Sequence, residues 1–141
     1  MNVEGAYTDF DANTFSSLND QNNKGFALKA NLKEKIAGKK EGKVFLWEIN
    51  TENLSPAFNR IERFREVEFE RNWNTRTLLR YGESEWLSEA KVIREFSQGK
   101  FISLSGAHYE IGSVYDGNKM KFLVNADLSK RIKLQIDASA L

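Results

Sequence analysis

The spacing of hydrophobic and polar residues predicts helices in the first two thirds of the chain, together with one early strand. A helix over 26–36 is indicated because apolar residues recur there at helical spacing, with lysines on the other side: Phe26, Leu28, Leu32 and Ile36. A strand over 44–49 is indicated by a short run of β-branched and aromatic residues. Ser55 and Pro56 suit the N-cap and first turn of another helix, which continues from Phe58.

The stretch 65–73 is compatible with two structures. Charged and apolar residues alternate over 65–71, which favours a strand with Val67 and Phe69 pointing inward. The same stretch is rich in Glu and Arg, and it also allows the preceding helix to continue to Trp73. We prefer the helix and keep the strand as the alternative.

The last third of the chain changes from helical spacing to strict alternation. A helix over 86–96 has acidic residues in its first turn and Gly99 after its end. Four antiparallel strands are predicted after it, with a turn at Gly106 and Ala107 between the first two and a hairpin turn over 115–118: residues 101–104, 108–115, 119–125 and 131–137. We therefore expect an α+β fold, with N-terminal helices and one early strand, then a helix and a four-stranded antiparallel meander with helices packed on one face.

Composition limits the classes of protein that fit. With 141 residues, 40% hydrophobic, the chain is long enough for a single globular domain over 1–141, in which 1–24 is a candidate irregular or weakly ordered segment. It has no cysteine, which excludes disulfides, cysteine-ligated metals and a thiol nucleophile. We expect neither a metal nor another cofactor.

The sequence contains no apolar run of about 20 residues and no signal-peptide pattern. We therefore expect no membrane partner. The predicted location is the cytoplasm, or export followed by action in the cytoplasm of a target cell.

The net charge of +1 conceals an uneven distribution. Residues 1–23 carry four acids and no base, whereas residues 24–43 carry seven lysines against two glutamates. Residues 60–80 hold six arginines among aromatic residues and four glutamates. Ion pairs within the chain would explain this block, and a surface for a partner is the other interpretation. The candidate interface residues are Arg60, Arg63, Arg71, Trp73, Arg76, Arg80 and Trp86.

The single histidine, His108, is the main candidate for proton transfer near neutral pH. Alternation places Glu110 on the same side of a strand as His108 and Tyr109 on the opposite side. With Ser105, these residues form the candidate catalytic set of a metal-free ribonuclease, in which cations stabilise the charged phosphate: Lys119, Lys121, Arg131 and Lys133. An ordinary solvent-facing histidine is the simpler alternative.

The predicted order of elements over roughly residues 84–137 resembles small microbial ribonucleases and ribosome-dependent toxin nucleases. The resemblance lies in topology, without a shared motif. It implies a small nucleic-acid-binding domain, with RNA as the candidate partner and toxin-type ribonuclease activity. The alternative is a non-catalytic protein-binding module, such as an inhibitor or immunity-type protein. Sequence does not separate that module from a structural or assembly subunit. A concave pocket would favour catalysis, and a contiguous exposed aromatic patch would favour binding.

Overall fold

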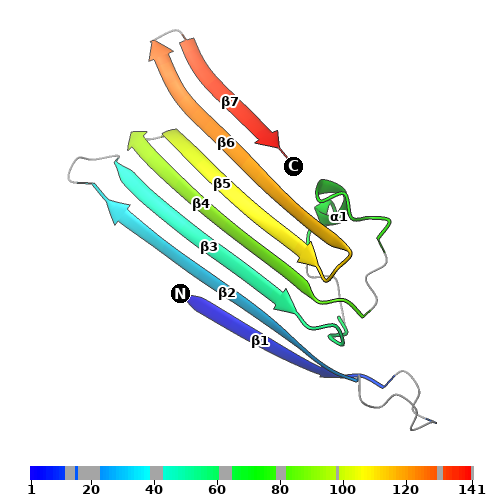
Figure 1. Cartoon of the computed structure of the whole chain (residues 1–141). Helices are drawn as coiled ribbons and strands as arrows, with labels where there is room; N and C mark the ends of the chain where they lie inside the picture. The colour runs from blue at the N-terminus through cyan, green and yellow to red at the C-terminus, as the bar shows by residue number, and fades with distance from the viewer. Residues whose placement is uncertain are drawn as a thin grey trace.

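The protein is all-β, with a single antiparallel sheet and one short helix. The computed structural model describes residues 1–11, 15, 23–38, 43–60, 65–78, 82–97, 99–129 and 132–140, and their side chains as far as residue 126. Within these residues seven strands form a meander in chain order (Figure 1): β1 (Asn2–Asp9), β2 (Lys24–Ala37), β3 (Val44–Leu54), β4 (Glu85–Ser97), β5 (Lys100–Ile111), β6 (Tyr115–Ser129) and β7 (Ile132–Ala140). The helix, α1, is Phe69–Asn72.

The predicted α+β class is wrong because two predicted helices are strands. Residues 26–36 lie in β2 and residues 86–96 lie in β4. A spacing of four residues satisfies both a helical period and a period of two. In β2 the large apolar residues are all even-numbered and the lysines at 29, 33 and 35 are all odd-numbered. This period of two is that of the observed strand.

The early strand is confirmed, and it extends to Leu54. Residues Asn2–Asp9 form β1, and most of the rest of the segment 1–24, expected to be irregular or weakly ordered, lies outside the described residues. The preferred helix over 65–73 is confirmed only for the four residues of α1, and the strand alternative is wrong. Asn74, with a φ of 54°, ends the helix in the left-handed conformation that asparagine tolerates. Residues 61–64 of the helix predicted after Pro56 lie outside the described part of the chain.

The antiparallel meander at the end of the chain is confirmed, with a different division into strands. β5 is continuous through Gly106 and Ala107, so the turn predicted there is wrong. The hairpin between β5 and β6 turns over 112–114, where Gly112 has a φ of 44°. Residues 115–118, predicted to form that turn, belong to β6.

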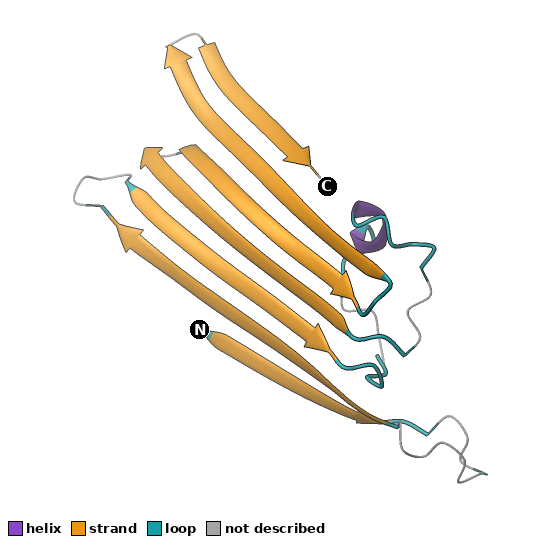
Figure 2. Ribbon diagram, viewed as in Figure 1, coloured by secondary structure: helices purple, strands orange, loops and turns teal. Residues whose placement is uncertain are grey.

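The sheet has a free face and a partly covered face. The segment from Ser55 to Ser84 leaves β3 and returns to β4, and α1 lies beside the adjoining ends of β5 and β6 (Figures 1 and 2). We name residues 55–84 the long-loop segment, the end of the sheet beside it the long-loop end, and the opposite end the hairpin end. The buried cluster consists of Trp73, Tyr109 and Ile111, with Phe69 and Tyr115 among the partly buried residues that pack against it. The core is therefore small and lies under α1.

Close approach of the backbone fixes this segment on the sheet. Phe58 crosses β2 at Gly25, where a Cβ atom would overlap the Phe58 backbone. Ser55 Oγ accepts a hydrogen bond from the Phe26 backbone N–H at 2.9 Å. Glycine is thus required at position 25 because any side chain there would displace the segment.

Candidate functional site

The register of the strands sorts the side chains onto two faces. Even-numbered side chains of β2, β4, β5 and β6 share one face with odd-numbered side chains of β1 and β3. We name this the apolar face, and the other, which carries α1, the polar face. The predicted catalytic set is divided between them. His108 and Glu110 lie on the apolar face, whereas Ser105, Lys119 and Lys121 lie on the polar face.

His108 belongs to a polar patch at the long-loop end of the apolar face. Its Nδ1 atom is 3.1 Å from the Asn118 side-chain oxygen, and its Nε2 atom is 3.8 Å from a Glu110 oxygen. The Trp86 ring meets the imidazole edge-on, with ring centroids 5.9 Å apart. His108 and Glu110 share a face as predicted, and Tyr109 points to the other face, as predicted. No lysine or arginine joins His108 among the contacts of the described residues.

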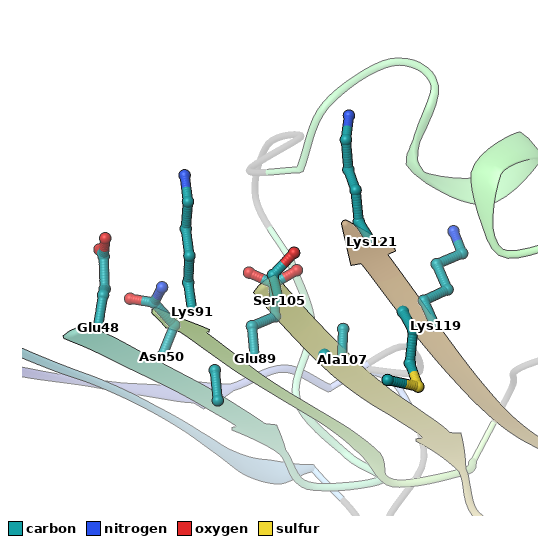
Figure 3. A pocket seen from close by; sticks show the side chains of 11 residues that line it. Glu48, Asn50, Glu89, Lys91, Ser105, Ala107, Lys119 and Lys121 are labelled. Carbon is teal, nitrogen blue, oxygen red and sulfur yellow. The ribbon is translucent and has the colours of Figure 1, made fainter. Parts of the chain in front are cut away.

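The polar face has a hollow of about 260 Å³ over β3 to β6 (Figure 3). Two rows of paired residues line it, Glu48–Lys91–Ser105–Lys121 and Asn50–Glu89–Ala107–Lys119. The small residues of β5 form the floor, and the longer side chains of β4 and β6 rise on either side (Figure 3). Ser105, Lys119 and Lys121 were predicted as site residues. Glu48, Glu89 and Lys91 were not, although the same alternation places them on this face.

For two of the predicted phosphate-binding residues, the structure does not describe the side chain. Arg131 lies outside the described residues. Lys133 lies in β7, and its side chain is outside the described part of the chain.

Arg65 fastens the long-loop segment to the polar face. Its guanidinium bonds to Glu52 and Glu85 and donates to the Tyr109 hydroxyl at 2.9 Å. The guanidinium also lies over the Phe69 ring, 4.5 Å from its centroid. Burial alone would lower the pKa of Arg65, but the negative groups around it raise that pKa above its ordinary value.

Glu85 is the carboxylate at the centre of this arrangement, at the long-loop end of β4. Burial opposes its ionisation, but the Tyr109 hydroxyl, Arg65 and Arg60 together hold the pKa of Glu85 below its usual value. Tyr109 donates to Glu85 Oε2 at 2.6 Å. The buried charges are therefore compensated, and the ion pairs are structural.

The predicted interface residues are dispersed. Arg60 pairs with Glu85, and Arg71 pairs with Glu68 at 3.0 Å on the surface. Trp73 is buried in the core, while Trp86 is exposed on the apolar face. Arg76 is exposed, and Arg63 and Arg80 lie outside the described residues. These residues do not form one surface.

The apolar face is the largest unexplained feature of the molecule. Leu28 is 47% exposed, Leu104 49% and Met120 61%. Every exposed large hydrophobic residue placed by strand register in the described part of the sheet is on this face: Val3, Tyr7, Phe26, Leu28, Leu32, Ile36, Ile49, Trp86, Val92, Ile102, Leu104, Met120 and Phe122. Sequence analysis missed this face because it assigned half of these residues to helices.

The total surface area reflects the single layer of the sheet. The chain exposes 10802 Å², whereas a compact protein of 16.2 kDa exposes about 7,500 Å². The excess of roughly 3,300 Å² includes polar as well as apolar atoms. No helix among the described residues is long and apolar enough to cross a lipid bilayer. No protein-family model, curated protein or solved structure that we compared matches the chain.

Proposed function

We propose that the chain is a non-catalytic structural module of a membrane, and that its apolar face contacts lipid hydrocarbon. The observation that carries this proposal is the inverted arrangement of the sheet. In an ordinary half-covered antiparallel sheet, the apolar face packs on the core and the polar face meets water. Here the chain places its long-loop segment, α1 and its ion pairs on the polar face, and it leaves the apolar face open.

The apolar residues of this face form a band that lies obliquely across the strands. On β2 the longest unbroken apolar run on this face is Phe26 to Leu32, centred at Lys29. Following the register across the sheet, Lys29 aligns with Gly117 of β6, but the apolar run of β6 is centred at Leu123, six residues away. The band is therefore oblique to the strands, with most of the displacement between β2 and β3.

A hydrocarbon layer crossed by tilted strands produces such an offset. Strands that cross a bilayer tilt by about 40° and lie about 4.8 Å apart, so a level band shifts by about 1.2 residues per strand. Over the four steps from β2 to β6 this gives about five residues, near the observed total of six, but five of those six residues fall at the single step from β2 to β3.

Aromatic residues at both ends of the band fit the same layering. Tyr7, Phe26 and Trp86 lie toward the long-loop end, and Phe45 and Trp47 lie toward the hairpin end. Tryptophan and tyrosine prefer the boundary between hydrocarbon and headgroups. The polar patch around His108 lies beyond the band at the long-loop end, where headgroups and water would meet it.

This proposal departs from the expectation of no membrane partner, which rested on the lack of a long apolar run. Alternating strands give no such run, since half of their residues face the other way. Hydrocarbon also leaves backbone groups at the open edges of β1 and β7 without partners, so the membrane-bound form must pair these edges with further strands. The ribonuclease and the protein-binding module stay predictions from the sequence.

Quenching of tryptophan fluorescence by brominated phosphatidylcholine tests the proposal directly. Trp47 and Trp86 lie on the apolar face and Trp73 in the core of the polar face, so one chain contains two probes and a control. We expect vesicles to bind the protein and brominated lipid to quench its fluorescence. Replacing both Trp47 and Trp86 by Phe should remove most of the quenching, and Trp73→Phe should preserve it.

The proposal is overturned if the protein stays in the aqueous fraction after vesicle flotation, or if replacing both Trp47 and Trp86 by Phe leaves the quenching unchanged. A stable water-soluble dimer that shields Trp47 without lipid would also overturn it, in favour of a protein-covered face.

A further inference from the structure

The polar face carries exposed lysines at the depth of the apolar band. Lys29 is the central residue of the apolar run of β2, and it lies on the polar face in register with Glu4 of β1 and Glu52 of β3. On β6 the apolar run is centred at Leu123, and the exposed Lys121 lies on the polar face two residues away. Charged side chains are costly in hydrocarbon. If lipid covers the apolar face, it therefore cannot cover the polar face as well.

Polar side chains are joined across the strands at this level. Asn31 of β2 donates to Glu48 of β3 at 3.0 Å and to Asn50 at 2.5 Å. The ammonium group of Lys33 lies 4.0 Å from the other oxygen of Glu48. The Lys33 side chain is nevertheless 53% exposed and that of Glu48 26%. These charges are paired with each other, and water still reaches them, so the surface they form is suited to water rather than to hydrocarbon.

α1 and Trp73 cover the polar face at its long-loop end. Trp73 packs on Tyr109, and the Nζ atom of Lys119 lies 4.1 Å from the Trp73 ring centroid. Next to Lys119, toward the hairpin end, the face is hollowed by about 260 Å³. Lys91 and Lys121 rise on either side of this hollow (Figure 3). No element of the described chain covers the hollow, so this part of the face is open.

We propose that the polar face lines a water-filled lumen, which is enclosed when the edges of β1 and β7 pair with further strands. This inference rests on the lipid proposal. A sheet whose two edges are both paired within hydrocarbon is closed on itself. With lipid outside, the polar face is then the inner surface, and in such membrane sheets the inner surface is polar. The lumen admits water and small polar solutes, and α1 narrows it at the long-loop end.

Cysteine labelling in lipid nanodiscs tests for water on this face, because the chain has no cysteine of its own. Neighbouring residues of one strand lie at nearly the same depth but on opposite faces. Lys29→Cys and Lys121→Cys report on the polar face, and Leu28→Cys and Phe122→Cys are their matched controls on the apolar face. The reagent is a charged methanethiosulfonate, and each rate is divided by that of the same variant unfolded in urea. We expect the polar-face cysteines to react at least tenfold faster than their neighbours.

A bulky reagent separates a lumen from open water. A maleimide on a long polyethylene glycol chain should label Ser113→Cys rapidly, because Ser113 is exposed in the turn between β5 and β6. The same reagent should label Lys121→Cys at least tenfold more slowly, since the polymer is too large to enter an enclosed lumen. Nanodiscs leave both surfaces of the membrane open, so both positions are tested in one sample.

The outcomes distinguish the lumen from the lipid proposal. Slow labelling at all four strand positions leaves the apolar face in lipid and overturns the lumen, in favour of a polar face covered by protein. Rapid labelling of Lys121→Cys by the bulky reagent also overturns the lumen, in favour of a sheet that lies on the membrane surface. Rapid labelling of Leu28→Cys and Phe122→Cys by the small reagent overturns the lipid proposal, and the lumen with it.

Discussion

The two faces of the sheet have opposite relations to the rest of the chain. The polar face holds the folded core, the long-loop segment and the ion pairs of Arg65, so its stability comes from contacts within the molecule. The apolar face has the greater hydrophobic surface and no covering element among the described residues. The comparison teaches that hydrophobicity does not locate the core of this protein. The core lies where the chain folds back, and the most apolar surface is left exposed.

The largest effect should come from removing the cation that holds the polar face together. Arg65→Met leaves Glu52 and Glu85 buried without their main partner, and breaking a buried ion pair on one side costs about 3–5 kcal/mol. We expect a loss of that size in urea unfolding, followed by the fluorescence of Trp73. The control is Arg71→Met, because the Arg71–Glu68 pair is exposed and should contribute less than about 1 kcal/mol. Similar losses in the two variants would contradict a special role for Arg65.

The next effect tests the apolar face. Leu32→Lys places a charge in the apolar band of β2, where hydrocarbon would penalise it by about 2–4 kcal/mol. Ala37→Lys adds the same charge to the polar face of the same strand. Vesicle flotation should show reduced membrane binding for Leu32→Lys and normal binding for Ala37→Lys. If Leu32→Lys binds vesicles normally, the apolar band does not contact hydrocarbon.

Much of the local structure can be predicted from this sequence, but its global arrangement cannot. The strand over 44–49 is confirmed. It was predictable because the apolar run is short and consists mainly of β-branched, aromatic and other apolar side chains. Residues 26–36 were assigned to a helix because Leu28, Leu32 and Ile36 satisfy two periods. The alternating lysines contained the deciding signal. When β2 and β4 are taken for helices, their apolar residues are expected to pack against the sheet. The open apolar face of the sheet then cannot be recognised.

The candidate site was predicted in part for a similar reason. Ser105, Lys119 and Lys121 do lie together, and His108 and Glu110 do share a face. The two groups were combined because a turn was expected at Gly106, which would have folded one strand back against the next. In the continuous β5, Ser105 and His108 are an odd number of residues apart, so they point to opposite faces. Parity along one strand thus decides which residues can act together.

The smallest expected effect concerns His108, and it separates the two faces most directly. The imidazole and the two lysines of the predicted ribonuclease lie on opposite sides of the sheet, so they cannot contact one phosphate. His108→Ala should therefore leave any cleavage of a labelled RNA unchanged. It should change stability by less than about 1 kcal/mol, because the hydrogen bond to Asn118 and the contacts with Glu110, Asp116 and Trp86 that it removes are all partly exposed. The measurement is the rate of RNA cleavage at low salt, beside Lys121→Gln as the variant from the other face. RNA cleavage that is lost in both variants would require the two faces to cooperate, and would contradict their separation.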